Sequence, residues 1–337
     1  MGIAIFRLRA TMVSIKIWKE AMCVDNFLVA LGVVFPMLVM MSVGALLRHR
    51  DLLDRQTARR MDAVNFRVFL PSLLFINIYR SDFSQDFRPG MVAFVVAGFF
   101  LTLAAVLVAV PRLVKDPRRV SVICQAIIRC NFVIFGISVT EHIYGEGNVG
   151  AAALLSAIVV PLVNVTCVIL LESLRPGGGR TTAKQLLCRL AKNPLLIASA
   201  LALALAFSGI RLPAMVQDVV TTLSRVASPV AFVMLGATLS LDGFLRNRRS
   251  LFWTVLTRMV VVPLLAMPLA ALLGFRGVEL AAMMAFFCSP TAVSSFTMAQ
   301  QMGADGELAG QLVALTSVTS LFTIFCITFL FQSLGFL

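Results

Sequence analysis

Two apolar segments of the sequence are interrupted by polar residues of the kinds that end one helix and begin another. In the segment 278–302, Ser289 precedes Pro290, and the residue before a proline is pushed out of helical geometry. Serine is favoured as the cap of a helix start and proline at its first position, so a new half-helix is expected to begin here. In the segment 120–144, Asn131 can cap a second half-helix in the same way.

Helix starts of this kind favour anions, because their free backbone N–H groups and the positive end of the helix dipole both attract negative charge. If the two half-helix starts point at a common centre in the membrane, a carboxylate fits between them. A proline kink relieved by nearby Ser and Thr is the simpler alternative. The predicted substrate-binding residues are Gln125, Arg129, Asn131, Ser289, Pro290, Thr291 and Ser294.

Charged residues inside the apolar segments favour an anionic ligand. These are Arg67, Arg129, Arg225 and Arg258, with Glu141 as the one acid placed comparably. An arginine near the bilayer centre costs about 2.5–3.5 kcal/mol, so it is expected near an interface or facing a polar cavity. Arg129 adjoins a helix break, and we predict that it is the counter-charge of the substrate. For the other three arginines, snorkelling or packing against carbonyl groups is an equal alternative, and a coupling or structural role of these arginines and Glu141 stays open.

The composition indicates that these segments lie in a membrane. Of 337 residues, 59% are apolar and only 13% are charged, whereas a soluble domain has about 45–50% apolar and about 25% charged residues. This argues against a soluble enzyme, a disordered chain or a fibre. The net charge is +13, but the basic residues lie in short loops between apolar segments, which favours contact with the lipid bilayer over nucleic acid. No catalytic residue, metal site or cofactor is predicted, because the cysteines form no C-x-x-C pair and the two histidines are far apart.

Ten segments are about long enough for a helical span, and we predict an all-α membrane protein with ten transmembrane helices. The expected spans are 26–47, 63–79, 90–110, 120–144, 149–171, 194–210, 219–241, 250–274, 278–302 and 308–337. The chain then divides into an N-terminal extension (1–24), a first five-helix unit (25–171), a cytoplasmic linker (172–193) and a second five-helix unit (194–337). The extension is read as an interfacial helix or a misassigned start of the chain.

The distribution of basic residues predicts the orientation in the cell membrane. Alternate loops carry 17 Lys and Arg residues on one side and 8 on the other. Because basic residues are retained on the cytoplasmic side, both termini are expected outside.

An internal repeat supports two related halves. Residues 67–71 and 225–229 share the pattern R-V-x-x-P, 158 positions apart, and Asn131 and Pro290 are each followed 16 residues later by a glycine in an acidic turn. Because each half has an odd number of helices, the second half must be inverted in the membrane. Inverted repeats with broken helices are typical of secondary transporters.

Three segments together resemble the auxin efflux carrier family of permeases, which includes bacterial malonate and malate carriers. They are F-L-P-S-L-L-F at 69–75, N-F-V-I-F-G at 131–136 and S-P-T-A-V at 289–293. The resemblance covers about residues 27–332. It implies two inverted five-helix repeats, unwound and crossing helices 4 and 9, and organic-anion transport by an elevator-like movement. The crossover residues of the family correspond to Asn131 and Pro290, whereas Cys130 stands where a proline is common among relatives.

The leading hypothesis is therefore a cell-membrane permease for a small carboxylate, with a dicarboxylate such as malonate as the first substrate to test. A sodium-coupled organic-anion symporter of the related bile-acid type is an alternative within transport. A membrane enzyme or a sensor without transport is an alternative from another class, but no span carries a nucleophile with a base at helical spacing. The direction of transport and the coupling ion stay open, and a homodimer is compatible with the sequence.

Overall fold

The regular structure of the described residues is entirely helical. The computed structural model describes residues 28, 31–32, 34–80, 88–145, 150–175 and 183–337, so the predicted extension 1–24 lies outside the described residues. The helices are α2 (Arg55–Val64), α3 (Leu70–Tyr79), α4 (Pro89–Leu113), α5 (Pro117–Ile128), α6 (Phe132–Tyr144), α7 (Gly150–Ser173), α8 (Ala183–Ala191), α9 (Pro194–Ser208), α10 (Ala214–Thr238), α11 (Leu241–Leu256), α12 (Val262–Leu272), α13 (Gly277–Cys288), α14 (Ser294–Gln301) and α15 (Gly306–Ser333). A further helix, Val34–His49, precedes α2.

Within this part of the chain, six helices are long and apolar enough to cross a membrane. They are Gln56–Tyr79, Pro89–Leu113, Gly150–Ser173, Ala214–Thr238, Asp242–Leu272 and Gly306–Ser333. The shorter apolar helices are Val34–His49, Pro194–Ser208 and Gly277–Cys288. The chain is thus a multi-pass membrane protein, whereas the count of ten spans and the inverted repeat stay predictions.

Two long helices pass through a widened π-helical turn. The turn η1 (Asn65–Phe69) joins α2 to α3, and η2 (Thr257–Val261) joins α11 to α12. Each turn is followed at once by a helix with a proline in its first two positions. A proline inside a helix lacks the N–H of the usual hydrogen bond and clashes with the preceding turn, and a wider turn accommodates this.

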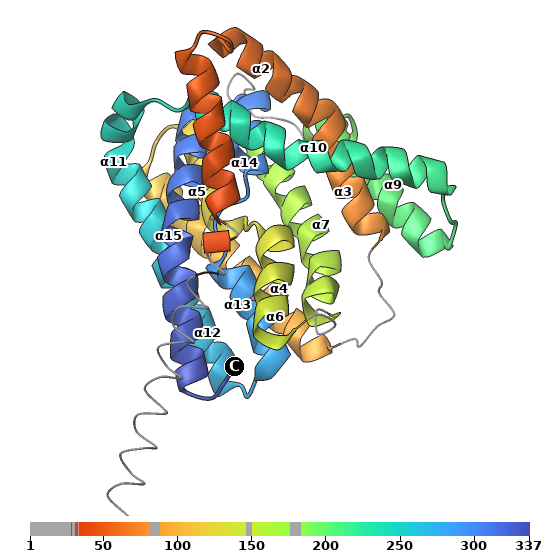
Figure 1. Ribbon diagram of the computed structural model, residues 1–337, viewed down its shortest axis with the longest axis vertical. Coiled ribbons are helices and arrows are strands. Elements are labelled where there is room, and N and C mark those ends of the chain that lie inside the picture. Colours follow the sequence, from red (N-terminus) through yellow and green to blue (C-terminus); the bar gives the residue numbers. More distant parts are fainter. Residues whose placement is uncertain (1–27, 29–30, 33, 81–87, 146–149, 176–182) are drawn as a thin grey trace, which may run out of the picture.

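The helices pack in a pattern that leaves the two interrupted spans in the interior. Helix α10 crosses α2 and α3, with α9 beside α3, and α11 lies along α15 at the opposite edge (Figure 1). Between them, most residues of α5, α13 and α14 are buried. The interior is therefore the place where the ends of the interrupted helices meet.

Some boundaries differ from the expected ones for a common reason. Helix α2 starts at Arg55, eight residues before the predicted span 63–79, and α8 lies inside the predicted linker 172–193. Both helices carry arginines and are amphipathic, so a search for uncharged segments passes over them.

Two glycines allow a very close crossing of the helix Val34–His49 with α10. A Cβ atom on Gly44 would overlap the carbonyl oxygen of Val233, and one on Gly236 would overlap the carbonyl oxygen of Met41. Small residues at such crossings let two backbones approach within van der Waals contact, which is a main source of helix association in lipid.

We expect Gly44→Ala and Gly236→Ala each to lower the thermal midpoint of the purified protein, because the added methyl group forces the backbones apart at a cost of about 1–3 kcal/mol. Gly32→Ala is the matched control, since nothing lies within 4 Å of a Cβ atom at that position. Thermal unfolding in detergent measures all three variants. Equal midpoints for Gly44→Ala and Gly32→Ala would contradict the close crossing.

Candidate functional site

The two interrupted spans cross at their breaks. Helix α5 ends at Ile128 and α6 begins at Phe132, while α13 ends at Cys288 and α14 begins at Ser294. The N–H of Asn131 donates a hydrogen bond of 2.8 Å to the carbonyl of Pro290, which joins the two non-helical segments directly.

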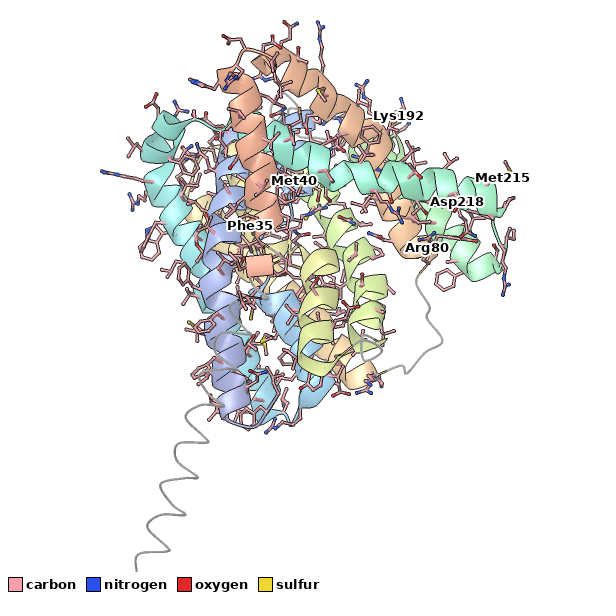
Figure 2. All side chains as sticks on the ribbon, in the orientation of Figure 1. Phe35, Met40, Arg80, Lys192, Met215 and Asp218 are labelled. Carbon is pink, nitrogen blue, oxygen red and sulfur yellow. The ribbon has the colours of Figure 1, made fainter. Side chains whose placement is uncertain are left out.

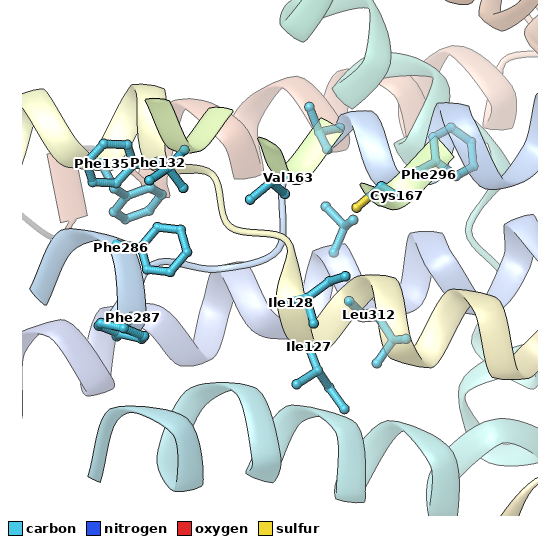
Figure 3. Close-up of a cluster of buried hydrophobic side chains, with 14 of the residues drawn as sticks. Ile127, Ile128, Phe132, Phe135, Val163, Cys167, Phe286, Phe287, Phe296 and Leu312 are labelled. Carbon is cyan, nitrogen blue, oxygen red and sulfur yellow. The ribbon is translucent and has the colours of Figure 1, made fainter. Parts of the chain in front are cut away.

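Aromatic side chains pack around this crossing. The rings of Phe132 and Phe286 make an edge-to-face contact at 6.0 Å, and Phe286 makes another with Phe287 at 5.0 Å. Figure 3 shows these rings beside the extended segments that connect the half-helices. These rings form an apolar cluster beside the crossing.

The second break is longer than the sequence predicts. The expectation that Ser289 caps the new half-helix is wrong: Ser289 ends α13 with a ψ of 151°, and α14 begins five residues later. Thr291, in the middle of this non-helical segment, bonds to two other helices. The hydroxyl of Thr291 donates to the carbonyl of Ala126 at 2.8 Å, and its N–H donates to Oγ1 of Thr316 at 3.2 Å.

The first break is sharp although it contains no proline. Asn131 occupies the cap position before α6, as predicted, but its side chain makes no capping hydrogen bond. Instead, the side chain lines a cavity. With Cys130 in place of a proline, the non-helical segment is only three residues long, 129–131.

Arg258 in η2 binds the carbonyl ends of both interrupted spans. Its guanidinium donates to the carbonyls of Ile127 at 3.1 Å, Phe286 at 3.1 Å and Ser289 at 2.8 Å, and only 1% of the residue is exposed. The last carbonyls of a helix lack partners and form the negative end of its dipole. A buried cation there satisfies the helix ends of α5 and α13 together, so Arg258 is a structural residue of the crossing.

A cavity of about 100 Å³ lies against the two breaks. One water needs about 10–15 Å³ of such volume, so there is room for several waters or a small organic molecule. The polar residues that line it are Asn77, Arg129, Asn131, Asn164, Ser228 and Ser294. Apolar residues of α3, α7 and the two breaks line the rest. It is therefore a small, mostly apolar pocket with a few polar groups, as is typical of binding sites.

Arg129 is the cationic residue of this cavity. It follows the end of α5, and its Nη2–H donates to Oγ of Ser294 at 2.7 Å while Nη1 lies 2.7 Å from the sulfur of Met298. The residue is 4% exposed, and no carboxylate of the described residues lies within 4 Å of its guanidinium. A buried arginine without a carboxylate partner can accept an anionic ligand with charge-assisted hydrogen bonds.

Neutral polar groups line the same cavity as Arg129. Asn164 of α7 is buried, and its Nδ2 has no hydrogen-bond partner. Asn131 from the first break and Ser228 from α10 add an amide and a hydroxyl group. These groups can hydrogen-bond oxygen atoms of a ligand without adding charge.

The structure brings only some of the predicted residues to the cavity. Arg129, Asn131 and Ser294 line it, and the carbonyl of Pro290 is bonded beside it. The other predicted binding residues are buried outside its lining: Gln125, Ser289 and Thr291. Of the residues left open between coupling and structural roles, three are exposed rather than inside: Arg67, Arg225 and Glu141.

Three cavity residues were not predicted: Asn77, Ser228 and Asn164. Each is a polar residue within an apolar span, which is the signal that could have selected it. The sequence does not say which of several such residues face one another across different helices.

A membrane-embedded helical bundle with a cavity at the crossing of two broken helices has the architecture of a transporter. The profile of the family described as membrane transport protein, the auxin efflux carrier family, matches residues 29–184 and 179–328, and the chain belongs to this family. The resemblance seen in the sequence is thereby confirmed.

Two relatives agree with this assignment. The chain is 24% identical over 310 residues to the uncharacterized transporter MJ1031 of Methanocaldococcus jannaschii, an alignment that covers 88% of this chain and 97% of the relative. It is 27% identical over 254 residues to the uncharacterized transporter YfdV of Escherichia coli K12, covering 72% and 77%. The homologues are thus named transporters rather than enzymes.

Proposed function

We propose that this membrane transport protein is a permease for a small organic anion, and that the anion binds in the cavity beside Arg129. A dicarboxylate such as malonate is the first substrate to test. The observation that carries the proposal is the buried guanidinium of Arg129, which faces the cavity without a carboxylate partner among the described residues. Leaving such a charge unpaired in a membrane interior is costly, and a ligand carboxylate offsets the cost.

The neutral polar groups of the cavity can bind a second oxygen-containing group of the same ligand. A carboxylate bound to the fork of Arg129 leaves Asn131, Asn164 and Ser228 to bond the rest of the molecule. The small volume favours a short chain between the two ends. These features together favour a short dicarboxylate over a large anion.

Binding can be measured before any transport assay. We expect malonate to raise the thermal midpoint of the purified protein in a concentration-dependent manner, because a ligand that binds only the folded state stabilises it by about 2.7 kcal/mol at one hundred times its Kd. Malonamide has the same shape without the charges, so it serves as the matched control and is expected to have no effect. Uptake of labelled malonate into proteoliposomes then tests transport. If no short mono- or dicarboxylate stabilises the protein or crosses the membrane, the proposal fails.

A further inference from the structure

A buried acidic residue, Asp62, lies outside the cavity. Asp62 belongs to α2, within the span Gln56–Tyr79, and is 0% exposed. Its Oδ1 accepts a hydrogen bond from the hydroxyl of Thr297 at 2.6 Å, and its Oδ2 accepts one from the amide of Gln301 at 3.1 Å. No basic side chain of the described residues forms an ion pair with it. A carboxylate in this position is costly to bury, and it can reduce the cost by taking up a proton.

The two donors connect Asp62 to the proposed anion site. Thr297 and Gln301 lie on α14, the half-helix that begins with Ser294, and Ser294 is bonded to Arg129. Positions 294, 297 and 301 fall on one face of a helix. Helix α14 has eight residues and is therefore about 12 Å long. The first residue of this short helix, Ser294, contacts the cation of the anion site, and Thr297 and Gln301, one and two turns later, contact Asp62.

Asp62 and the cavity lie at different heights along the same helix. Asn77, which lines the cavity, follows Asp62 by 15 residues in the continuous span Gln56–Tyr79, a separation of about 22 Å. The contact of Asp62 with α14 is therefore far from Asn77 along the span, whereas on α14 Thr297 follows the cavity residue Ser294 by only one helical turn. Any movement of α14 relative to α2 during transport must break the hydrogen bonds of Asp62.

Among the described residues, no charged side chain near this contact forms an ion pair with Asp62. Helix α14 has no titratable side chain. The titratable residues of the helices packed on α2 point elsewhere: Arg67 of η1 and Arg225 of α10 are exposed, and Asp218 lies at the far end of α10 (Figure 2). Within α2 itself, Arg59 and Arg60 are exposed. On the preceding helix, Arg48 donates to the carbonyl of Ala237.

We propose that Asp62 couples anion transport to protons; the proposal rests on the proposed permease function. The charged carboxylate accepts both hydrogen bonds and holds α14 against α2. When a proton binds to Oδ2, that oxygen becomes a donor facing the N–H of Gln301, which cannot accept, so this bond from α14 is lost and the contact weakens, whereas the hydroxyl of Thr297 can still bond to Oδ1. One proton at Asp62 offsets one of the negative charges that the anion brings to Arg129. The anion and the proton are therefore carried in the same direction, and the proton is released when Asp62 bonds to α14 again.

The transport test uses labelled malonate in proteoliposomes with the membrane potential clamped at zero, because a malonate dianion carried with one proton still moves one negative charge. With the outside one pH unit more acidic, wild-type protein is expected to accumulate malonate about tenfold, because one pH unit corresponds to a tenfold ratio for a one-proton symport. Asp62→Asn, which mimics the neutral acid, is expected to abolish accumulation but to keep exchange of labelled for unlabelled malonate at equal pH. Accumulation by Asp62→Asn overturns the proposal. If Asp62→Asn inserts into the membrane but loses exchange as well as accumulation, Asp62 has a structural role. This result also overturns the proposal.

Asp54→Asn is the matched control. Asp54 is an exposed acid that caps α2 by accepting from the N–H of Thr57 at 2.8 Å, and asparagine caps equally well. The variant loses the same charge eight residues away, so its accumulation is expected to equal that of wild type. Failure of Asp54→Asn to accumulate malonate overturns the assignment to Asp62.

An infrared measurement tests Asp62 without any substrate. As the pH is lowered, the C=O stretch of a protonated carboxyl group is expected to appear in the wild-type protein, and the part that belongs to Asp62 is absent from Asp62→Asn. Identical pH-dependent spectra of the two proteins overturn the proposal. If no carboxylate is bound or transported, the permease function fails, while this spectrum still reports on Asp62.

Discussion

Arg129→Ala is expected to abolish binding and transport of the anion while leaving the protein folded in the membrane. Arg129 is the cationic side chain of the cavity lining, and its fork can donate two charge-assisted hydrogen bonds to one carboxylate. Each such bond contributes about 1.5–3 kcal/mol, so their loss raises the Kd at least about a hundredfold. Thermal stabilisation by malonate and uptake into proteoliposomes measure the effect.

Three further variants make this test specific. Arg129→Lys keeps the charge but loses the planar fork, so we expect binding between that of wild type and that of Arg129→Ala. Arg67→Ala and Arg225→Ala remove the same charge from spans in which the side chains are exposed, and both are expected to transport normally. Normal uptake by Arg129→Ala, or equal losses in all three alanine variants, would contradict a substrate role for Arg129.

The positions of the two breaks could be predicted because their causes are local. Serine before proline at 289–290 and an asparagine at 131 favour the end of one helix and the start of another, although a proline alone does not, since Pro161 and Pro229 lie inside α7 and α10. The length of the second break could not be predicted, because it depends on partners far away in the sequence. Thr291 bonds to the carbonyl of Ala126, and no local pattern announces that contact.

The sequence prediction placed Glu141 inside the helix bundle, whereas the structure buries Asp62, and the reason is related. Glu141 lies in an apolar segment, yet it faces outward near the end of α6. Asp62 lies in a stretch rich in arginine, yet the turn of α2 places it wholly inside against α14. Composition indicates how apolar a segment is, whereas the face on which one residue lies is decided by packing against other helices.

The roles of the intramembrane arginines separate in the same way. Inserting an arginine into the membrane interior costs free energy, so each of the four arginines is expected to have a polar partner or to lie near a cavity or an interface. Only the structure divides them into an arginine that faces a cavity, an arginine that binds carbonyl groups, and two that are exposed. The difference lies in which neighbours each guanidinium meets, and those neighbours come from other helices.

Arg258→Met is expected to destabilise the whole crossing and, as a result, to abolish transport. Methionine fills much of the space but donates no hydrogen bond, so the carbonyls of Ile127, Phe286 and Ser289 are left buried without the guanidinium. A buried polar group that loses its partner costs about 1–3 kcal/mol, and three such groups together amount to several kcal/mol. We expect a large fall in the thermal midpoint of the purified protein.

The contrast between the two arginines distinguishes binding from folding. Arg129→Ala is expected to keep the midpoint of the ligand-free protein and to lose its shift with malonate, whereas Arg258→Met lowers the midpoint itself. Arg225→Met, at an exposed position, is the matched control and is expected to leave both unchanged. A stable Arg258→Met protein would show that the helix ends at the breaks are held without the guanidinium. The two carbonyl ends would then not depend on a shared cation, and Arg258 would be free for another role.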